Sequence, residues 1–195
     1  YRIYGGMSFY QRKEVKDLIG YLRVIVNPRD EEAMKRIINY PARGIGKTTI
    51  DKAVLFANER NLSMWDVLCN AALYGFRSGT LEVIDNFATM IKMFQSELAK
   101  KNAYDLATLV GKNTGLVKDI FNDKTTEGLA RYENVQELLT SIKEFTEKPM
   151  NEEAGEVGDT RLGSYLKQIG WLTDWDEDKK ENDDDDTVRH KHAKK

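Results

Sequence analysis

Apolar side chains recur at intervals of three and four residues along most of the chain, which is the spacing of one face of an α-helix. The clearest stripe runs from Tyr10 to Asn27, and Pro28 is expected to end that helix. The same periodicity predicts two longer helices, from Thr80 to Lys100 and from Glu127 to Lys148. No alternation of strands and helices is visible, so the pattern predicts an all-α fold.

Shorter stretches with the same spacing complete a predicted orthogonal bundle of about eight helices. Asp30 is expected to cap the helix that follows Pro28, and Ser63 with Asp66 forms a weak capping box for another. The remaining short helices are expected from residue 47 to about residue 57, at residues 106–110, at residues 116–121 and at residues 161–169.

Three stretches fall outside this helical pattern. The opening "YRIYGG" alternates and ends in Gly5 and Gly6, which predicts a short strand followed by a turn. Residues 149–158 have no apolar periodicity and are expected to form a mobile loop. Residues 176–195 are rich in charge and are expected to be disordered, because they have little apolar surface to bury.

Composition narrows the class of protein. The chain has 195 residues, 41% hydrophobic and 32% charged, which suits one sizeable domain with an appendage. Cys69 is the single cysteine, so an internal disulfide is excluded and a cytoplasmic location is expected. Both histidines, His190 and His192, lie in the last six residues, so we expect no histidine-based metal or catalytic site. No apolar run approaches the roughly 18 residues of a membrane span.

Charge is unevenly distributed although the net charge is only −2. Residues 1–60 contain 12 Lys and Arg against 7 Asp and Glu. Such a local positive excess is compatible with nucleic-acid binding, and it is also typical of an ordinary solvated surface.

The stretch "PARGIGKTTID", residues 41–51, contains Gly46-Lys47-Thr48. These three residues match the end of the phosphate-binding P-loop motif. A P-loop also requires a glycine five positions before Gly46, where this chain has Pro41. A P-loop must also follow a buried strand, whereas a predicted helix precedes residues 41–51 of this chain. The pattern therefore argues against an ATP site and predicts no catalytic residues.

A turn between two helices is the other interpretation of this stretch. Gly44 and Gly46 permit a tight turn, and Ile45 is expected to point inward as an anchor. The helix that begins near Lys47 would present free backbone amides to a phosphate. Arg43, Lys47, Thr48 and Thr49 add charge and hydroxyl donors. From these residues alone, a helix-hairpin-helix grip on a DNA backbone and a merely structural turn both remain open.

A set of motifs in one order links the first third of the chain to a known family. They are "GG-x-x-F-x-x-R-x-E-V-K-D" (residues 5–17), "YLR" (21–23), "NP-x-D" (27–30), "RI-x-N-x-P-x-RGIG" (36–46) and Thr49-x-Asp51. Taken together they closely resemble the UvrD/PcrA/Rep helicases of superfamily 1. Looser agreement follows in "RYENVQELL" (131–139) and "LGSYLKQIGWLTDWD" (162–176).

In that family these segments form the accessory domain called 2B, which is inserted into the second motor domain. The resemblance implies that residues 1–8 end that motor domain, residues 9–175 form the helical 2B domain and residues 176–195 are an acidic linker or the end of an excised piece. It implies a parent enzyme that is a 3′–5′ ATP-dependent DNA helicase in repair or replication, which uses ATP and magnesium outside this fragment. It also implies a contact with duplex DNA, with partners in the motor domains. That contact falls on Arg43, Gly44, Ile45, Gly46 and Thr49, with Lys47 and Thr48 as neighbours.

The segment "RKEVKD" has three interpretations. The favoured one is a structural hinge between the motor and this domain, formed by Gly5, Gly6, Arg12, Glu14, Lys16 and Asp17. The others are a DNA contact through Arg12 and Lys16, and a polar helix face on which Arg12, Glu14, Lys16 and Asp17 form weak ion pairs. For Trp65, Trp171 and Trp175, packing inside the protein is favoured over stacking on bases.

Two functions of different classes follow. The first is a regulatory domain that binds the DNA backbone and performs no chemistry itself. The second is a helical module that docks on the motor domains or on a partner protein, without significant DNA binding of its own.

Overall fold

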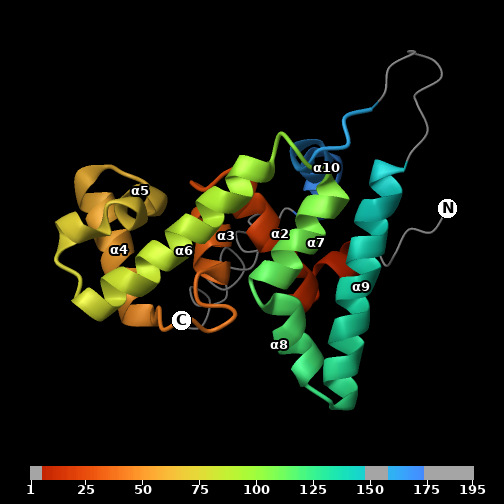
Figure 1. Ribbon diagram of the computed structural model, residues 1–195, viewed down its shortest axis with the longest axis horizontal. Coiled ribbons are helices and arrows are strands. Elements are labelled where there is room, and N and C mark those ends of the chain that lie inside the picture. Colours follow the sequence, from red (N-terminus) through yellow and green to blue (C-terminus); the bar gives the residue numbers. More distant parts are fainter. Residues whose placement is uncertain (1–5, 148–157, 174–195) are drawn as a thin grey trace, which may run out of the picture.

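The computed structural model describes residues 6–147 and 158–173 of the 195-residue chain (Figure 1). Within these ranges it has ten α-helices, two 3₁₀-helices and no strand, so the predicted all-α class is confirmed. The helices are α1 (Gly6–Tyr10), α2 (Lys13–Val26), α3 (Glu31–Ile37), α4 (Lys47–Arg60), α5 (Met64–Cys69), η1 (Ala71–Tyr74), α6 (Ser78–Glu97), α7 (Ala103–Asn113), α8 (Leu116–Asn122), α9 (Thr126–Thr146), α10 (Leu162–Gln168) and η2 (Gly170–Leu172).

Helix α2 is the centre of the bundle, because it contacts α1, α3, α6, α7, α9 and α10. Ten of its fourteen residues are buried. It approaches α3 closely at Gly20, where a Cβ atom would lie 2.9 Å from Cγ2 of Ile37. Figure 1 shows α4, α5 and the start of α6 at one end of the molecule, and α7, α8 and α9 at the other.

The predicted capping residues take the expected roles. The Asp30 side chain accepts a hydrogen bond from the amide of Ala33 at 3.2 Å, at the start of α3. Ser63 and Asp66 form a reciprocal capping box at the start of α5. Trp65 is buried in the core, as favoured from the sequence. No helix in the described part of the chain is both long and apolar enough to cross a membrane.

The N-terminal region differs from the prediction. A single helix from Tyr10 was expected, but two helices occur, separated at Gln11 and Arg12. Arg12 is extended, with φ −67° and ψ 137°, and its guanidinium reaches Asn134 on α9. Gly6 was expected in a turn but begins α1 at a φ of +51°.

Several sequence predictions lie outside the described residues. These are the strand at residues 1–5, including Gly5, most of the loop at residues 149–158, the acidic segment from residue 176, and Trp175 together with the side chain of Trp171.

Candidate nucleic-acid interface

The connection between α3 and α4 has one residue in the left-handed region. Gly44 has a φ of +82°, and no atom lies within 4 Å of the Cβ that another residue would add. A glycine is therefore favoured here by the left-handed backbone conformation, and not because a larger side chain would clash with its surroundings. Ile45 is fully buried, so it anchors the turn in the core as the sequence predicted.

The side chain of Asn39 closes this turn. Its Oδ1 accepts hydrogen bonds from the amide of Arg43 at 2.8 Å and from the amide of Ile45 at 3.1 Å. The amides of Arg43 and Ile45 lie in a turn and have no acceptor within a helix, so this one side chain satisfies both. The peptide bond between Tyr40 and Pro41 in the same turn is cis.

Arg43 points into the protein. Its Nη1 donates to the carbonyl oxygens of Ile37 and Ile38, both at 2.9 Å, at the C-terminal end of α3. The guanidinium also lies 5.3 Å from the ring centroid of Phe87. Cations are favoured at the carbonyl end of a helix, so the charge stabilises α3. Arg43 is half-buried, and the DNA contact expected of it from the sequence stays a prediction.

Tyr21, at the centre of α2, completes the inner side of the turn. Its hydroxyl accepts a hydrogen bond from Arg43 and donates to the carbonyl of Tyr40 at 2.5 Å. Burial raises the pKa of Tyr21 to about 12, although the nearby Arg43 opposes that shift. Neither Tyr21 nor Asn39 was predicted to have a role at this site. Both lie inside the family motifs "YLR" and "RI-x-N-x-P-x-RGIG", which is the signal that could have identified them.

The N-terminus of α4 faces solvent directly after this turn. Gly46 is the N-cap residue, with φ −79° and ψ 176°, and no side chain caps the helix. The first turn of α4 has no acidic residue. Gly46, Lys47 and Thr48 are exposed, and Thr49 is half-buried.

These features give the helix end the chemistry of an anion site. The first amides of a helix have no partner within it, and the helix dipole adds a partial positive charge. Lys47 contributes a full charge, while Thr48 and Thr49 contribute hydroxyl groups. The preceding element is helix α3 and not a strand, so the strand–loop–helix context of a P-loop is missing here, as the sequence analysis argued.

Sequence comparison with known proteins identifies the family of the chain. The model of the family described as UvrD-like helicase C-terminal domain matches residues 1–188. The chain belongs to this family. It is 31% identical over 183 residues to the ATP-dependent DNA helicase PcrA of Staphylococcus aureus, which covers 93% of this chain and 24% of that protein. It is 36% identical over 154 residues to DNA helicase II of Haemophilus influenzae, covering 78% of this chain and 21% of that protein.

A third relative of this UvrD-like domain is DNA helicase II of Salmonella typhimurium, 36% identical over 150 residues, with 75% of the chain and 20% of that protein covered. The UvrD-like domain thus spans about a quarter or less of the length of these relatives.

Within the predicted hinge segment of the UvrD-like domain, Glu14 and Asp17 are buried in the bundle, whereas Arg12 is exposed. Asn134 on α9 donates from Nδ2 to Glu14 at 2.6 Å, and its Oδ1 accepts from Arg12 at 3.0 Å. Asp17 is buried and pairs with Lys13 at 2.7 Å and with Arg36 at 3.0 Å. The alternative of an exposed polar face is therefore wrong for Glu14 and Asp17, which join α2 to α9 and α3.

The other predicted hinge residues lie near these contacts. Lys16 is half-buried on α2, and Gly6 begins α1. The hinge role itself stays a prediction.

Proposed function

We propose that this UvrD-like domain is a 2B accessory domain that binds the sugar-phosphate backbone of duplex DNA at the N-terminus of α4. The observation that carries the proposal is the exposed, uncapped helix end at Gly46, with no acidic residue in its first turn. An unfilled helix N-terminus with an adjacent lysine favours a phosphate group. Backbone amides contact phosphates in the same way at any base sequence, so we expect binding to be independent of sequence.

The residues of the turn have separate tasks in this proposal. Lys47, Thr48 and Thr49 hold the phosphate together with the amides of the first turn of α4. Gly44 and Gly46 are exposed and carry no side chain, so a DNA strand can approach the backbone closely. Ile45, Asn39 and Arg43 act from inside by fixing the position of the turn.

The domain would act as part of a longer helicase. One relative is by name an ATP-dependent DNA helicase. We extend that activity to the parent protein as 3′–5′ unwinding in DNA repair or replication in the cytoplasm. ATP and magnesium would bind in motor domains outside this chain, and the domain would regulate unwinding without chemistry of its own. The hinge between the domain and the motor would be formed by Gly5, Gly6, Arg12, Glu14, Lys16 and Asp17.

The test is a fluorescence-anisotropy titration of a labelled DNA hairpin at low and moderate salt. The decisive variant is Gly46→Asp. An N-cap aspartate accepts hydrogen bonds from the first-turn amides and stabilises a helix. It also places a negative charge where the phosphate would lie. We expect the variant to fold at least as stably as the original domain and to lose salt-sensitive DNA binding.

Two further variants identify the charges involved. Lys47→Ala is expected to weaken binding without changing stability. Lys100→Ala is the matched control, because Lys100 is an exposed lysine in the turn after α6. Equal binding by the domain and by the Gly46→Asp variant would contradict the proposal. Hydrolysis of ATP by this domain alone would overturn the assignment of the turn to DNA.

A further inference from the structure

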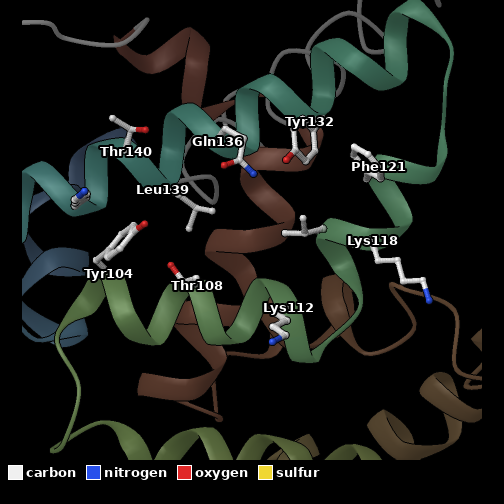
Figure 2. Close-up of a pocket in the computed structure, with 11 residues that line it drawn as sticks. Tyr104, Thr108, Lys112, Lys118, Phe121, Tyr132, Gln136, Leu139 and Thr140 are labelled. Carbon is white, nitrogen blue, oxygen red and sulfur yellow. The ribbon is translucent and has the colours of Figure 1, made fainter.

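A groove with a volume of about 880 Å³ lies between α7, α8 and α9 (Figure 2). Its apolar lining comes from Tyr104 on α7, Val117 on α8, and Tyr132 and Leu139 on α9. At the α8 side, Phe121 is 52% exposed. An exposed aromatic ring beside an apolar groove is typical of an interaction site.

Helix α9 has an apolar inner face and an amphipathic outer face. The inner face carries Val135, Leu138 and Ile142, which are buried, and Asn134, which bonds to α2. The outer face carries positions spaced by three and four residues that line the groove or extend it: Leu129, Tyr132, Gln136, Thr140 and Lys143. Leu129 is 57% exposed. The inner face makes the buried contacts of α9 with the bundle. On the outer stripe Tyr132 packs against Phe121 of α8, while Leu129 stays largely exposed.

The charged residues that line the groove are lysines, while Glu133 and Glu137 lie beside Gln136 and Thr140 at its α9 edge. Lys112, Lys118 and Lys143 line it, and no Asp or Glu does so. Lys143 pairs with Glu147 at 3.9 Å, but both side chains are more than half exposed, so that pair is weak. Lys112 and Lys118 are exposed on the α7 and α8 side of the groove.

We infer that this groove binds an amphipathic helix of another protein, with apolar anchors toward the groove and acidic residues beside them. The outer stripe of α9 from Leu129 to Lys143 is about 21 Å long at the rise of an α-helix. That length matches a bound helix of about four turns. Helix-in-groove recognition uses apolar anchors at three- and four-residue spacing, and the three lysines complement acidic flanks.

The aromatic geometry disfavours single-stranded nucleic acid as the occupant. Bases stack on open aromatic faces. Here the rings of Phe121 and Tyr132 meet edge to face, with centroids 5.3 Å apart and an interplanar angle of 61°. The amine of Lys124 lies 3.5 Å from the centroid of Phe121 and covers one of its faces. The rings therefore form an apolar wall and not a stacking platform.

The probe for the test is a fluorescein-labelled helical peptide of about four turns, with Leu and Phe at the anchor positions and Glu at the others. A second peptide has Lys in place of Glu, and a third has Ser in place of the anchors. We expect anisotropy to detect binding of the first peptide only. Amide shifts in the ¹⁵N-labelled chain should cluster at residues such as Thr108, Val117 and Gln136.

Matched variants locate the site. Lys112→Glu with Lys118→Glu should weaken peptide binding by about tenfold or more, because two favourable charge contacts become repulsive. Lys92→Glu with Lys100→Glu makes the same charge change on exposed residues of the α6 region and should leave affinity within about twofold. Thr108→Trp should block the groove without altering its charge. Circular dichroism checks that each variant is folded.

Other outcomes overturn the inference. Failure of the acidic peptide to bind, or equal binding of the lysine peptide, would exclude an acidic helix. Displacement of the peptide by oligothymidylate, lost in the Lys112/Lys118 variant, would assign the groove to nucleic acid. Dimerisation in sedimentation experiments that Thr108→Trp abolishes would assign it to a second copy of the chain.

Discussion

Arg43 shows how the surroundings of one residue decide what its charge does. Its guanidinium donates to two carbonyl oxygens at the end of α3 and to the hydroxyl of Tyr21. Hydrogen bonds to charged groups contribute about 1.5 to 3 kcal/mol each. Without Arg43, the carbonyl of Ile38 loses this donor, whereas that of Ile37 keeps its bonds from Tyr21 and Tyr40. We therefore expect Arg43→Ala to lower the free energy of unfolding by about 2 to 3 kcal/mol, as measured by urea denaturation.

Lys47 provides the comparison for that prediction. Its side chain is exposed at the start of α4. Lys47→Ala should change the free energy of unfolding by no more than about 0.5 kcal/mol. If the two variants had equal stability, the inward bonds of Arg43 would contribute nothing.

Gly44 permits a second prediction at this scale. At a φ of +82° any other residue is strained, by about 1 to 2 kcal/mol. Gly44→Ala should lower the free energy of unfolding by that amount. Gly79→Ala, in the first turn of α6 and also with open space around its added Cβ, should instead stabilise the protein by some tenths of a kcal/mol. A destabilising effect of equal size at both positions would show that backbone strain is not the cause.

At the scale of single elements, the capping box of α5 predicts a dependence on pH. Hydrogen bonds from Ser63 lower the pKa of Asp66. A carboxyl with a lowered pKa in the folded state stabilises the protein above its unfolded pKa, near 4. That contribution is lost as the pH falls through the lower folded pKa.

The variant that tests this is Asp66→Asn. At pH 7 it should be less stable than the original protein by about 1 kcal/mol. The difference in free energy of unfolding should shrink as the pH is lowered from about 4 toward 2. A difference that did not change with pH would mean that the charge of Asp66 has no part in the cap.

Asn134 on α9 makes the polar contact with the N-terminal end of α2, through hydrogen bonds to Glu14 and Arg12. Asn134→Ala would leave the buried Glu14 carboxylate without its donor at 2.6 Å, so we expect a loss of about 1 to 3 kcal/mol. In a double-mutant cycle with Glu14→Ala, the two effects should not add, because each variant removes the same contact. Additive losses would show that the two side chains act independently.

At the scale of the whole molecule, the charge distribution limits how DNA is bound. The net charge is −2, so the chain as a whole offers no long-range attraction to DNA. Binding at the α4 N-terminus would neutralise about one or two phosphates. The logarithm of the binding constant should fall with the logarithm of salt concentration with a slope of about −1 to −2. Lys47→Ala should make that slope smaller by about 1.

The same titration, with AT-rich and GC-rich hairpins, separates backbone binding from base recognition. Affinities within about twofold of each other are expected for backbone contacts. A strong preference for one sequence would instead require side chains that reach base edges, which the turn does not supply in this proposal.

The amino-acid sequence by itself determined the all-α class, the main helices, the caps at Asp30 and Ser63, and the family. These follow from neighbours at most a few residues apart, since helical periodicity, capping and motif spacing are local properties. The buried anchor at Ile45 was also predictable, because it is an apolar residue between two glycines in a polar turn.

Only the tertiary structure decided what Arg43, Glu14 and Asp17 do, and where α9 leaves an open groove. From its neighbours in sequence, Arg43 is expected to be an exposed cation beside a glycine turn. In the structure it is half-buried and bonds inward to Tyr21, 22 residues away. From its neighbours in sequence, Glu14 is expected on a polar helix face. In the structure it is buried and accepts a hydrogen bond from Asn134, 120 residues away. Burial and pairing depend on contacts between distant segments, and a single sequence contains no direct record of which segments meet.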